Sequence, residues 1–394
     1  MKIKGFSAAA VQAGIRYSNR LDLGLIFSEV PAVTAGMFTT NAFRAAPVVL
    51  DIERLQQGRA QAILVNSGNA NACTGAKGMQ LAVDTGAMAA KELGIDESLI
   101  QVASTGVIGE PLSSEPFARS MPELVKKLSP DGFTELSEAI MTTDTVNKVA
   151  TATVTLGDKE VNLLGVAKGS GMIMPDMATM LCFVVTDAQI AFPALREAVQ
   201  AGVEETFNRI TVDGDTSTND TVLVMANGAA DNEWIDEENP EDQKFFADAL
   251  YTVLRELALK IVADGEGATK VVTLTVKGAR EKQEAMNAAK TIANSALVKT
   301  AFFGEDANWG RIVAALGRSE CRFRPDKVTI SFDDVIMVDK GLGLGAKAEQ
   351  KASEVLKKKE FAVTIDLHDG TESATVFTCD FSYDYVKINA DYRS

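Results

Sequence analysis

The stretch GVAKGSGMIMPDMATMLCFVVTDA, residues 165–188, joins a glycine-rich loop to a continuous apolar strand. The glycines allow backbone angles that other residues avoid, and Pro175 restricts the chain shortly before Ala178 and Thr179. The apolar run that follows is typical of a strand covered on both faces. A threonine in this position is usually structural. If the chain were cut before Thr179, however, that residue would gain its own base, an α-amine with a pKa of about 7.7 to 8.0.

A single histidine, His368, limits the chemistry open to the chain of 394 residues. Mechanisms of the Ser-His-Asp type would have to use this residue, and metal sites built from several histidines are excluded. His368 lies in the segment LHDG at the end of a predicted strand, where we expect a turn or a solvent-exposed position. An acyl-transferring enzyme of this composition would therefore use a carboxylate, a lysine or a free amino terminus as its base.

The net charge of −15, from 39 basic and 54 acidic side chains, disfavours a nucleic-acid partner but permits a small zwitterionic substrate. The four cysteines are scattered, and the N-terminal segment lacks the uninterrupted apolar run of a signal peptide. Apolar runs are also shorter than the roughly 18 to 20 residues of a membrane helix. We therefore expect a cytoplasmic protein with reduced cysteines and with no nucleic-acid or membrane partner.

Strand-like and helix-like patterns alternate along the chain. Apolar runs predict strands over 62–65, 99–103, 149–156, 161–167, 180–188, 221–227 and 271–276, and helical periodicity predicts helices over 77–93, 114–141 in two pieces, 193–208, 240–263 and 280–299. This order predicts an α/β (α+β) fold, with layered sheets favoured over one doubly wound sheet. We expect a main domain over residues 1–280 and a smaller C-terminal α/β domain over residues 281–394.

Two motifs suggest ligands but are better explained as turns. GLGLGA at 341–346 matches a relaxed dinucleotide-binding fingerprint, and Asp366 follows at the distance of a ribose-binding acid. Only residues 347–394 remain after this loop, too few for several βαβ units, so we favour a turn into a surface helix. TVDGDTSTND at 211–220 offers oxygen ligands for a hard cation. Its spacing does not fit an EF-hand, and a hydrogen-bonded turn before a strand is the simpler interpretation.

The chain resembles, essentially from end to end, the ornithine acetyltransferase family (the glutamate N-acetyltransferases of arginine biosynthesis). The resemblance is carried by PAVTAGMFTTNAFRAAPV, VNSGNANACTG, ASTGVIGEPL, MTTDT, AKGSGMI-PDMATML, TVDGDTSTNDTV, DGEGATK, VKTAFFGEDANWGRI and YVKINADYRS, in family order. Two positions depart from the family pattern: Met174 stands where His or Ala is common, and Asp176 where Asn is common. We expect both to adjust the loop without abolishing activity.

The resemblance implies a layered α-β-β-α sandwich like that of the N-terminal-nucleophile hydrolases, with a smaller C-terminal α/β domain. It also implies that the precursor cleaves itself between Ala178 and Thr179, giving chains 1–178 and 179–394 in a heterotetramer of two each. Thr179 would then take the acetyl group from N2-acetylornithine, release ornithine and pass the group to glutamate in a ping-pong cycle. No metal or resident cofactor is implied, and the use of acetyl-CoA as a second acetyl donor stays open.

The resemblance also assigns the site residues. Thr105 and Gly106 would form the oxyanion hole, and the substrate-binding residues would be Thr142, Lys168, Thr179, Glu266, Asn389 and Ser394. Lys168 suits a substrate carboxylate and Glu266 an ammonium group, whereas Asn389 and Ser394 would add neutral hydrogen bonds. The resemblance does not decide whether Thr142 or its neighbour Thr143 contacts the substrate.

Two alternatives to acetyl transfer stay open. An aminopeptidase or amidase could use the same fold and nucleophile, with water as the acyl acceptor. A non-catalytic protein could instead bind an amino acid or a nucleotide around the loop at 341–346.

Overall fold

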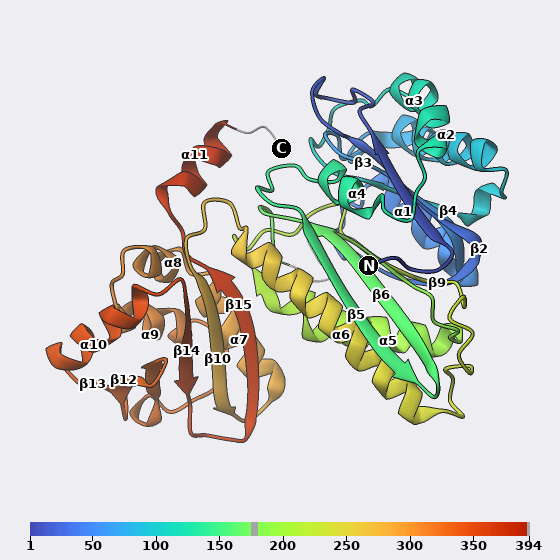
Figure 1. Ribbon diagram of the computed structural model, residues 1–394. Coiled ribbons are helices and arrows are strands. Elements are labelled where there is room, and N and C mark those ends of the chain that lie inside the picture. Colours follow the sequence, from blue (N-terminus) through green and yellow to red (C-terminus); the bar gives the residue numbers. More distant parts are fainter. Residues whose placement is uncertain (175–179, 392–394) are drawn as a thin grey trace. The chain divides into compact units, whose positions relative to one another are not determined.

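The computed structural model describes residues 1–174 and 180–391, which divide into two compact units (Figure 1). Of the described residues, the first unit comprises 1–174, 180–208 and 215–261, and the second comprises 209–214 and 262–391. The sequence-based boundary after residue 280 lies inside the second unit, directly after the strand β10 (Val271–Ala279). This strand pairs with two later strands of the second unit, so the chain belongs to that unit well before residue 280.

An eight-stranded sheet organises the first unit. Its order is β4-β3-β2-β9-β7-β6-β5, with β1 paired to β2. The strands are β1 (Phe6–Val11), β2 (Leu23–Phe38), β3 (Arg59–Asn66), β4 (Ile100–Ser104), β5 (Lys148–Leu156), β6 (Lys159–Lys168), β7 (Leu181–Thr186) and β9 (Thr221–Ala226). The long strand β2 joins the two halves of this sheet, because its first residues pair with β1 and β3 and its last residues pair with β9. The register with β3 shifts between Phe27 and Ala32, where a bulge lets the strand change direction.

Helices cover both halves of this sheet, so the first unit has four layers. These helices are α1 (Ala46–Arg54), α2 (Gly75–Leu93) and α3 (Glu115–Lys126) on one half, α5 (Phe192–Glu205) and α6 (Pro240–Ala263) on the other, and α4 (Phe133–Ala139) beside the core between the halves (Figure 1). On β3, Ala62 and Leu64 face the helices, whereas Ile63 and Val65 face a core shared with β6, β7 and β9. On β6, Gly165 faces α6. The expected layered α/β fold is confirmed.

A seven-stranded sheet with the order β13-β12-β11-β14-β10-β15-β8 forms the second unit. Beside β10 its strands are β8 (Ile210–Thr211), β11 (Thr329–Phe332), β12 (Val335–Asp339), β13 (Leu342–Gly343), β14 (Glu360–Asp366) and β15 (Glu372–Cys379), and its helices are α7 (Lys282–Ala293), α8 (Ala296–Phe303), α9 (Trp309–Gly317), α10 (Ala346–Leu356) and α11 (Tyr383–Asp391). The prediction of one helix over 280–299 is wrong, because the chain leaves the helical path at Asn294 and Ser295. Such short polar residues compete for backbone hydrogen bonds and favour helix ends.

The two motifs interpreted as turns have that role in the structure. The loop at 341–346 belongs to an antiparallel hairpin at the sheet edge, where β12 pairs antiparallel with both β11 and β13, and α10 follows it. A dinucleotide site needs a parallel strand–helix–strand unit, so the structure gives no support to nucleotide binding by this loop. The segment 211–220 leads directly into β9 at Thr221, which confirms that it places a strand.

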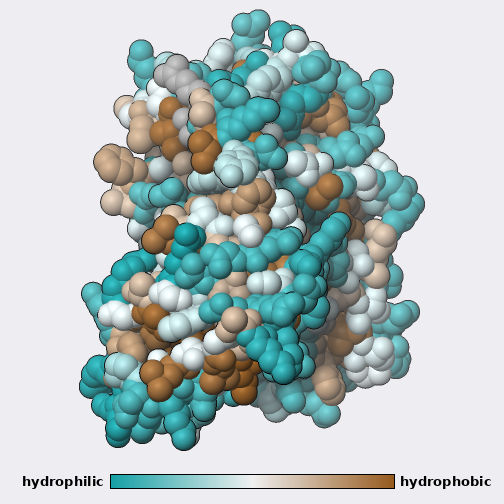
Figure 2. Space-filling view, turned by 90° about the vertical axis from the view of Figure 1, so that its left-hand side faces the viewer, coloured by the Kyte–Doolittle hydropathy of each residue, from teal (hydrophilic) through white to brown (hydrophobic). Residues whose placement is uncertain are grey.

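The surface combines charged and apolar residues. On the face shown in Figure 2, hydrophilic residues predominate, and hydrophobic residues form several separate patches. The exposed large hydrophobic side chains include Tyr383 and Val386 on α11 and Leu342 and Leu344 near β13. Within residues 1–174 and 180–391, no helix combines the length and the hydropathy needed to cross a membrane.

Candidate active site

The first part of the site is the loop that follows β4 and carries Thr105 and Gly106. Strand β4 runs parallel to β3, so the ends of both strands lie at the same sheet edge. The backbone N–H of Thr105 donates to the carbonyl of Asn66 (3.0 Å), and the N–H of Val107 donates to the carbonyl of Gly68 (3.3 Å). The predicted oxyanion loop is therefore held against the loop of the NSGNANACTG segment.

Only glycine fits at position 106. Its φ of +132° lies in a region that side-chain-bearing residues rarely adopt. A Cβ atom there would stand 2.3 Å from the carbonyl carbon of Gly68 and 2.5 Å from the backbone nitrogen of Asn69. These contacts explain why the loop after β4 carries glycine where it approaches the backbone of the other loop.

Lys168 lies beside this loop, as the resemblance implies for one substrate-binding residue. It is the last residue of β6 and is only 8% exposed, and its Nζ donates to Thr105 Oγ1 at 3.4 Å. The chain thus brings together Thr105, Gly106 and Lys168 although 62 positions separate Gly106 from Lys168 in the sequence.

Asp144 connects Lys168 with Thr142. One carboxylate oxygen accepts hydrogen bonds from the N–H of Gly169 (2.7 Å) and from Nζ of Lys148 (2.8 Å). The other accepts from the N–H of Thr142 (3.0 Å). The side chains of Asp144 and Lys148 are fully buried. One carboxylate therefore fixes the backbone of two predicted substrate-binding segments.

Asp144 is a buried carboxylate that stays ionised. Burial raises its pKa, but the charges of Lys168 and Lys148, together with the hydrogen bonds it accepts, outweigh burial and lower the pKa to about 2. Removing Asp144 would leave two buried lysines without this counter-charge. Nothing in the local sequence distinguishes this aspartate, so sequence reasoning missed it.

Replacing Asp144 by asparagine is expected to lower the free energy of unfolding at pH 7 by about 2 kcal/mol. The folded pKa of about 2 lies below that of an unfolded aspartate, so the ionised group stabilises the fold above pH ~4. This contribution is lost as the pH falls from about 4 toward 2. Urea unfolding between pH 7 and pH 3 should show a smaller decline for Asp144→Asn than for the wild type.

The matched control is Asp131→Asn, which removes an aspartate whose side chain is 69% exposed. This variant should retain the wild-type decline of stability with acid. A decline of equal size in Asp144→Asn and in the wild type would contradict the assigned role of the Asp144 carboxylate.

Asp220 is a second buried carboxyl group associated with Lys168, and it differs from Asp144. It is 1% exposed, and it lies directly before β9. Burial raises its pKa well above the usual range, and the charge of Lys168 opposes this shift only in part. Burial therefore favours the protonated form of Asp220. The motif that contains Asp220, at residues 211–220, was singled out in the sequence, but the burial of this side chain was not predicted.

The cleavage site and the end of the chain fall outside the described residues. These are Ala178, Thr179 and Ser394. The strand predicted directly after Thr179 is present as β7, which lies between β6 and β9 in the sheet. Its six residues are all buried, as a strand covered on both faces requires.

The structure also brings together Glu266 and Asn389, which both belong to the second unit. Glu266 lies in the loop between α6 and β10 and is 7% exposed. Nδ2 of Asn389, on α11, donates to Glu266 Oε2 at 2.7 Å and to the carbonyl of Tyr385 at 3.0 Å. Two of the predicted substrate-binding residues therefore contact each other.

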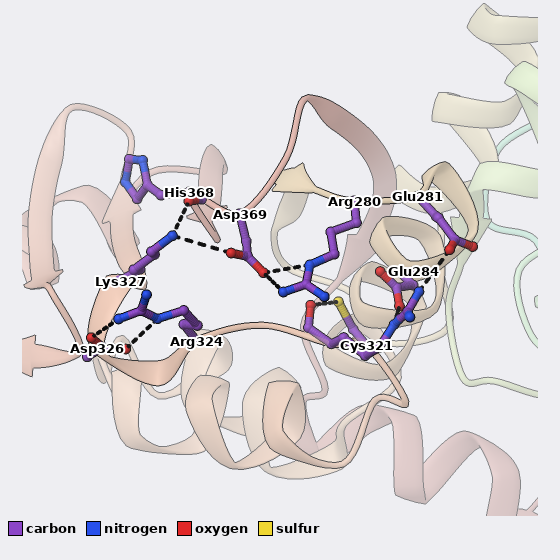
Figure 3. Close-up of polar contacts among 10 residues, drawn as sticks. Arg280, Glu281, Glu284, Cys321, Arg324, Asp326, Lys327, His368 and Asp369 are labelled. Carbon is purple, nitrogen blue, oxygen red and sulfur yellow. Dashed lines mark hydrogen bonds and ion pairs between the residues drawn. The ribbon is translucent and has the colours of Figure 1, made fainter.

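The only histidine has a surface position, as expected. Its side chain is 52% exposed, and Nε2 of His368 lies 3.1 Å from Thr329 Oγ1. Figure 3 shows the residue beside an ion-pair network of the second unit, in which Asp369 contacts both Arg280 (2.7 Å) and Lys327 (3.3 Å). This network holds a turn after β14. His368 contacts none of the predicted site residues within its own unit.

The described residues contain no group of three or more histidine, cysteine or acidic side chains arranged to hold a metal ion. All four cysteines are free thiols, and burial raises the pKa of three of them, Cys182, Cys321 and Cys379. The chemical groups assembled near Thr105 are instead a buried ammonium, two buried carboxyl groups and closely packed backbone amides. Such a set can bind a carboxylate and stabilise a developing oxyanion.

Comparison with known proteins agrees with this arrangement. The ArgJ family matches residues 7–394. The "arginine biosynthesis bifunctional protein ArgJ" of Desulfotalea psychrophila is 59% identical over 394 residues, and that of Geobacter sulfurreducens is 52% identical; both alignments cover 100% of each chain. A crystal structure of the ArgJ protein from Bacillus halodurans is 45% identical with a TM-score of 0.51, covering 53% of this chain and 98% of that chain. The chain belongs to the ArgJ family.

Proposed function

We propose that this protein transfers the acetyl group of N2-acetylornithine to glutamate, giving ornithine and N-acetylglutamate in arginine biosynthesis. The observation that carries the proposal is the contact of Lys168 with the Thr105–Gly106 loop in a chain of the ArgJ family. A cation for an amino-acid carboxylate thus lies beside a loop that suits an oxyanion. The names of the full-length relatives support a role in arginine biosynthesis and do not favour the aminopeptidase alternative.

Thr179 is the nucleophile of the proposed cycle. Its hydroxyl attacks the acetyl carbonyl, and its free α-amine takes the hydroxyl proton and returns it to the departing amine of ornithine. The oxygen of the tetrahedral intermediate accepts hydrogen bonds from Thr105 and Gly106. Donors of this kind are worth roughly 10²–10³ in kcat each. The α-amine of glutamate then attacks the acetyl-threonine ester and restores the free hydroxyl.

Substrate recognition follows from the chemistry of the remaining residues. Lys168 binds the substrate carboxylate, with Thr142 beside it through the Asp144 connection. Glu266 binds an ammonium group, and Asn389, which already contacts it, adds a hydrogen bond together with Ser394. Loss of any of these groups should affect substrate binding more than the chemical step.

Self-cleavage between Ala178 and Thr179 produces the working form, chains 1–178 and 179–394. The sheet supports a lasting association, because the two strands that follow the cut, β9 and β7, lie between β2 and β6, which precede it. Strand β7 pairs with β6, and β9 pairs with β2, so the chains cannot separate without breaking two ladders. We propose a cytoplasmic heterotetramer of two chains of each kind.

The word "bifunctional" in the names of the relatives supports a second activity. We propose that acetyl-CoA serves as an additional acetyl donor to glutamate, with no resident cofactor. An assay with acetyl-CoA and glutamate, without N-acetylornithine, tests this point by the formation of N-acetylglutamate.

The proposed reaction is tested by the choice of acyl acceptor. The purified full-length protein is incubated with N-acetylornithine, with and without glutamate. We expect N-acetylglutamate to form only when both are present, with one ornithine released for each N-acetylglutamate. Release of acetate at the same rate with and without glutamate would instead identify an amidase. An intact chain of 42.0 kDa without transfer activity would overturn the self-processing mechanism.

A further inference from the structure

Asn219 is a buried amide at the junction of three segments near the start of β9. It is 6% exposed. Its Nδ2 donates to the carbonyl of Ala70 and to the carbonyl of Ser104, both at 2.7 Å, and its Oδ1 accepts from Thr218 Oγ1 at 2.6 Å. Both amide hydrogens and the amide oxygen are therefore used.

The bonding partners fix the orientation of this amide. One side of Asn219 faces two carbonyl oxygens, which can only accept, and the other side faces a hydroxyl that donates. An aspartate at this position would place a carboxylate oxygen against the carbonyls of Ala70 and Ser104. The site therefore selects asparagine over its nearest isostere.

These contacts reach the oxyanion loop directly. Ser104 supplies the C=O and Thr105 the N–H of one peptide group, so Asn219 holds one side of this group while Asn66 accepts from the other side at 3.0 Å. Ala70 lies in the loop after β3 that packs against Gly106. A single side chain thus ties together the two loops whose close approach orients the Thr105–Gly106 segment.

We propose that Asn219 is a positioning residue for acetyl transfer, which holds the Ser104–Thr105 peptide so that Thr105 and Gly106 face the developing oxyanion. This inference rests on the proposed function. Oxyanion donors act because they are fixed before charge develops, so a small displacement of the loop weakens stabilisation of the transition state more than binding of the substrate. The role is distinct from the turn interpretation of the 211–220 segment, which explains the strand but not the buried amide.

The test compares Asn219→Asp with a matched control, Asn232→Asp. Asn232 is 3% exposed, its Nδ2 donates to the carbonyls of Gln189 (3.2 Å) and Glu233 (2.6 Å), and its Oδ1 accepts from the N–H of Gln189 (2.8 Å). Its bonding pattern repeats that of Asn219 at the opposite ends of β7 and β9. Both substitutions remove the same donors, but only one faces the oxyanion loop.

Kinetics are measured on the processed fraction, quantified by intact mass, so that a cleavage defect does not count as a loss of kcat. We expect Asn219→Asp to lower kcat about 10- to 100-fold, less than the loss of a whole oxyanion donor, with KM for N-acetylornithine changed less than about threefold. We expect Asn232→Asp to retain kcat. If Asn219→Asp does not fold, Asn219→Ala removes the donors without adding an acid and is measured in the same way.

Two results would overturn the inference: equal kcat in the Asn219 and Asn232 variants, or an Asn219 variant in which KM rises while kcat is unchanged. The proposed function is tested separately by the wild-type protein in the same assay. A wild type without acetyl transfer would refute that function, whereas an active wild type with an equally active Asn219→Asp variant would refute only the positioning role.

Discussion

Replacement of Thr179 by alanine is expected to abolish both self-cleavage and acetyl transfer. In the proposed cycle the hydroxyl is the nucleophile in each step, and the α-amine that would serve as base exists only after cleavage. The single histidine, His368, has a half-exposed side chain beside Thr329, and the proposed cycle assigns it no role. Intact-mass measurement should find one uncleaved chain of 42.0 kDa, and the transfer assay should detect no N-acetylglutamate.

The control for this prediction is Thr179→Ser, which keeps the hydroxyl and the α-amine. We expect this variant to cleave and to retain measurable transfer. Cleavage of Thr179→Ala at the normal position would contradict the assignment of the nucleophile. Cleavage elsewhere would show that the scissile bond does not precede Thr179.

Replacement of Lys168 by methionine is expected to lower kcat/KM by about 10²–10³, chiefly through KM. Methionine preserves much of the buried volume but removes the cation that we assign to the substrate carboxylate. Lys168 and Lys148 are the two cations that lower the pKa of Asp144, so in this variant only Lys148 remains to do so. The comparison is made by steady-state kinetics with glutamate and N-acetylornithine varied in turn.

The matched control is Lys270→Met in the second unit. Lys270 is 7% exposed, like Lys168, and its Nζ contacts Glu305 (3.4 Å) and the carbonyl of Leu356 (2.7 Å). This variant should be less stable but should retain kcat/KM. A substrate whose carboxylate is converted to an amide sharpens the test, because the wild type should discriminate against it and Lys168→Met should not. Equal discrimination by both proteins would contradict the assignment of Lys168.

Much of the first unit can be predicted from the sequence, because its central strands are continuous apolar runs. The residues of β7 and β9 are all buried, as expected for short apolar runs in strands that are covered on both faces. The long strand β2 was not predicted. It contains Ser28, Glu29 and Pro31 at the bulge between its two halves, and these residues interrupt the periodicity by which strands are recognised.

The sequence also did not predict that the second unit is built from two separate segments of the chain. Its strand β8 contains only Ile210 and Thr211, too few residues to produce a pattern, yet it pairs with β15 from the end of the chain. Pairing over this distance depends on tertiary packing rather than on local preference. This is why the second unit includes a short segment that precedes α6.

In the candidate site, too, some residues could be named from local sequence motifs, whereas others depend on which segments pack together in the fold. Thr105, Gly106 and Lys168 were named from family motifs. Asp144, Asn219 and Asp220 were not, because burial of a polar side chain depends on which strand ends become neighbours. Asn219 reaches Ser104 only because β9 and β4 lie in one sheet with β2 and β3 between them. No periodicity in the sequence encodes that arrangement.

The most direct measurement of the central claim is the mass of the chain that begins at Thr179 after the protein is mixed with N-acetylornithine alone. We expect this chain to gain the mass of one acetyl group, placed on Thr179 by peptide sequencing, while one equivalent of ornithine is released. Addition of glutamate should return the chain to its original mass and yield one equivalent of N-acetylglutamate. A chain that never gains the acetyl mass, with acetate released at the same rate whether or not glutamate is present, would contradict the account.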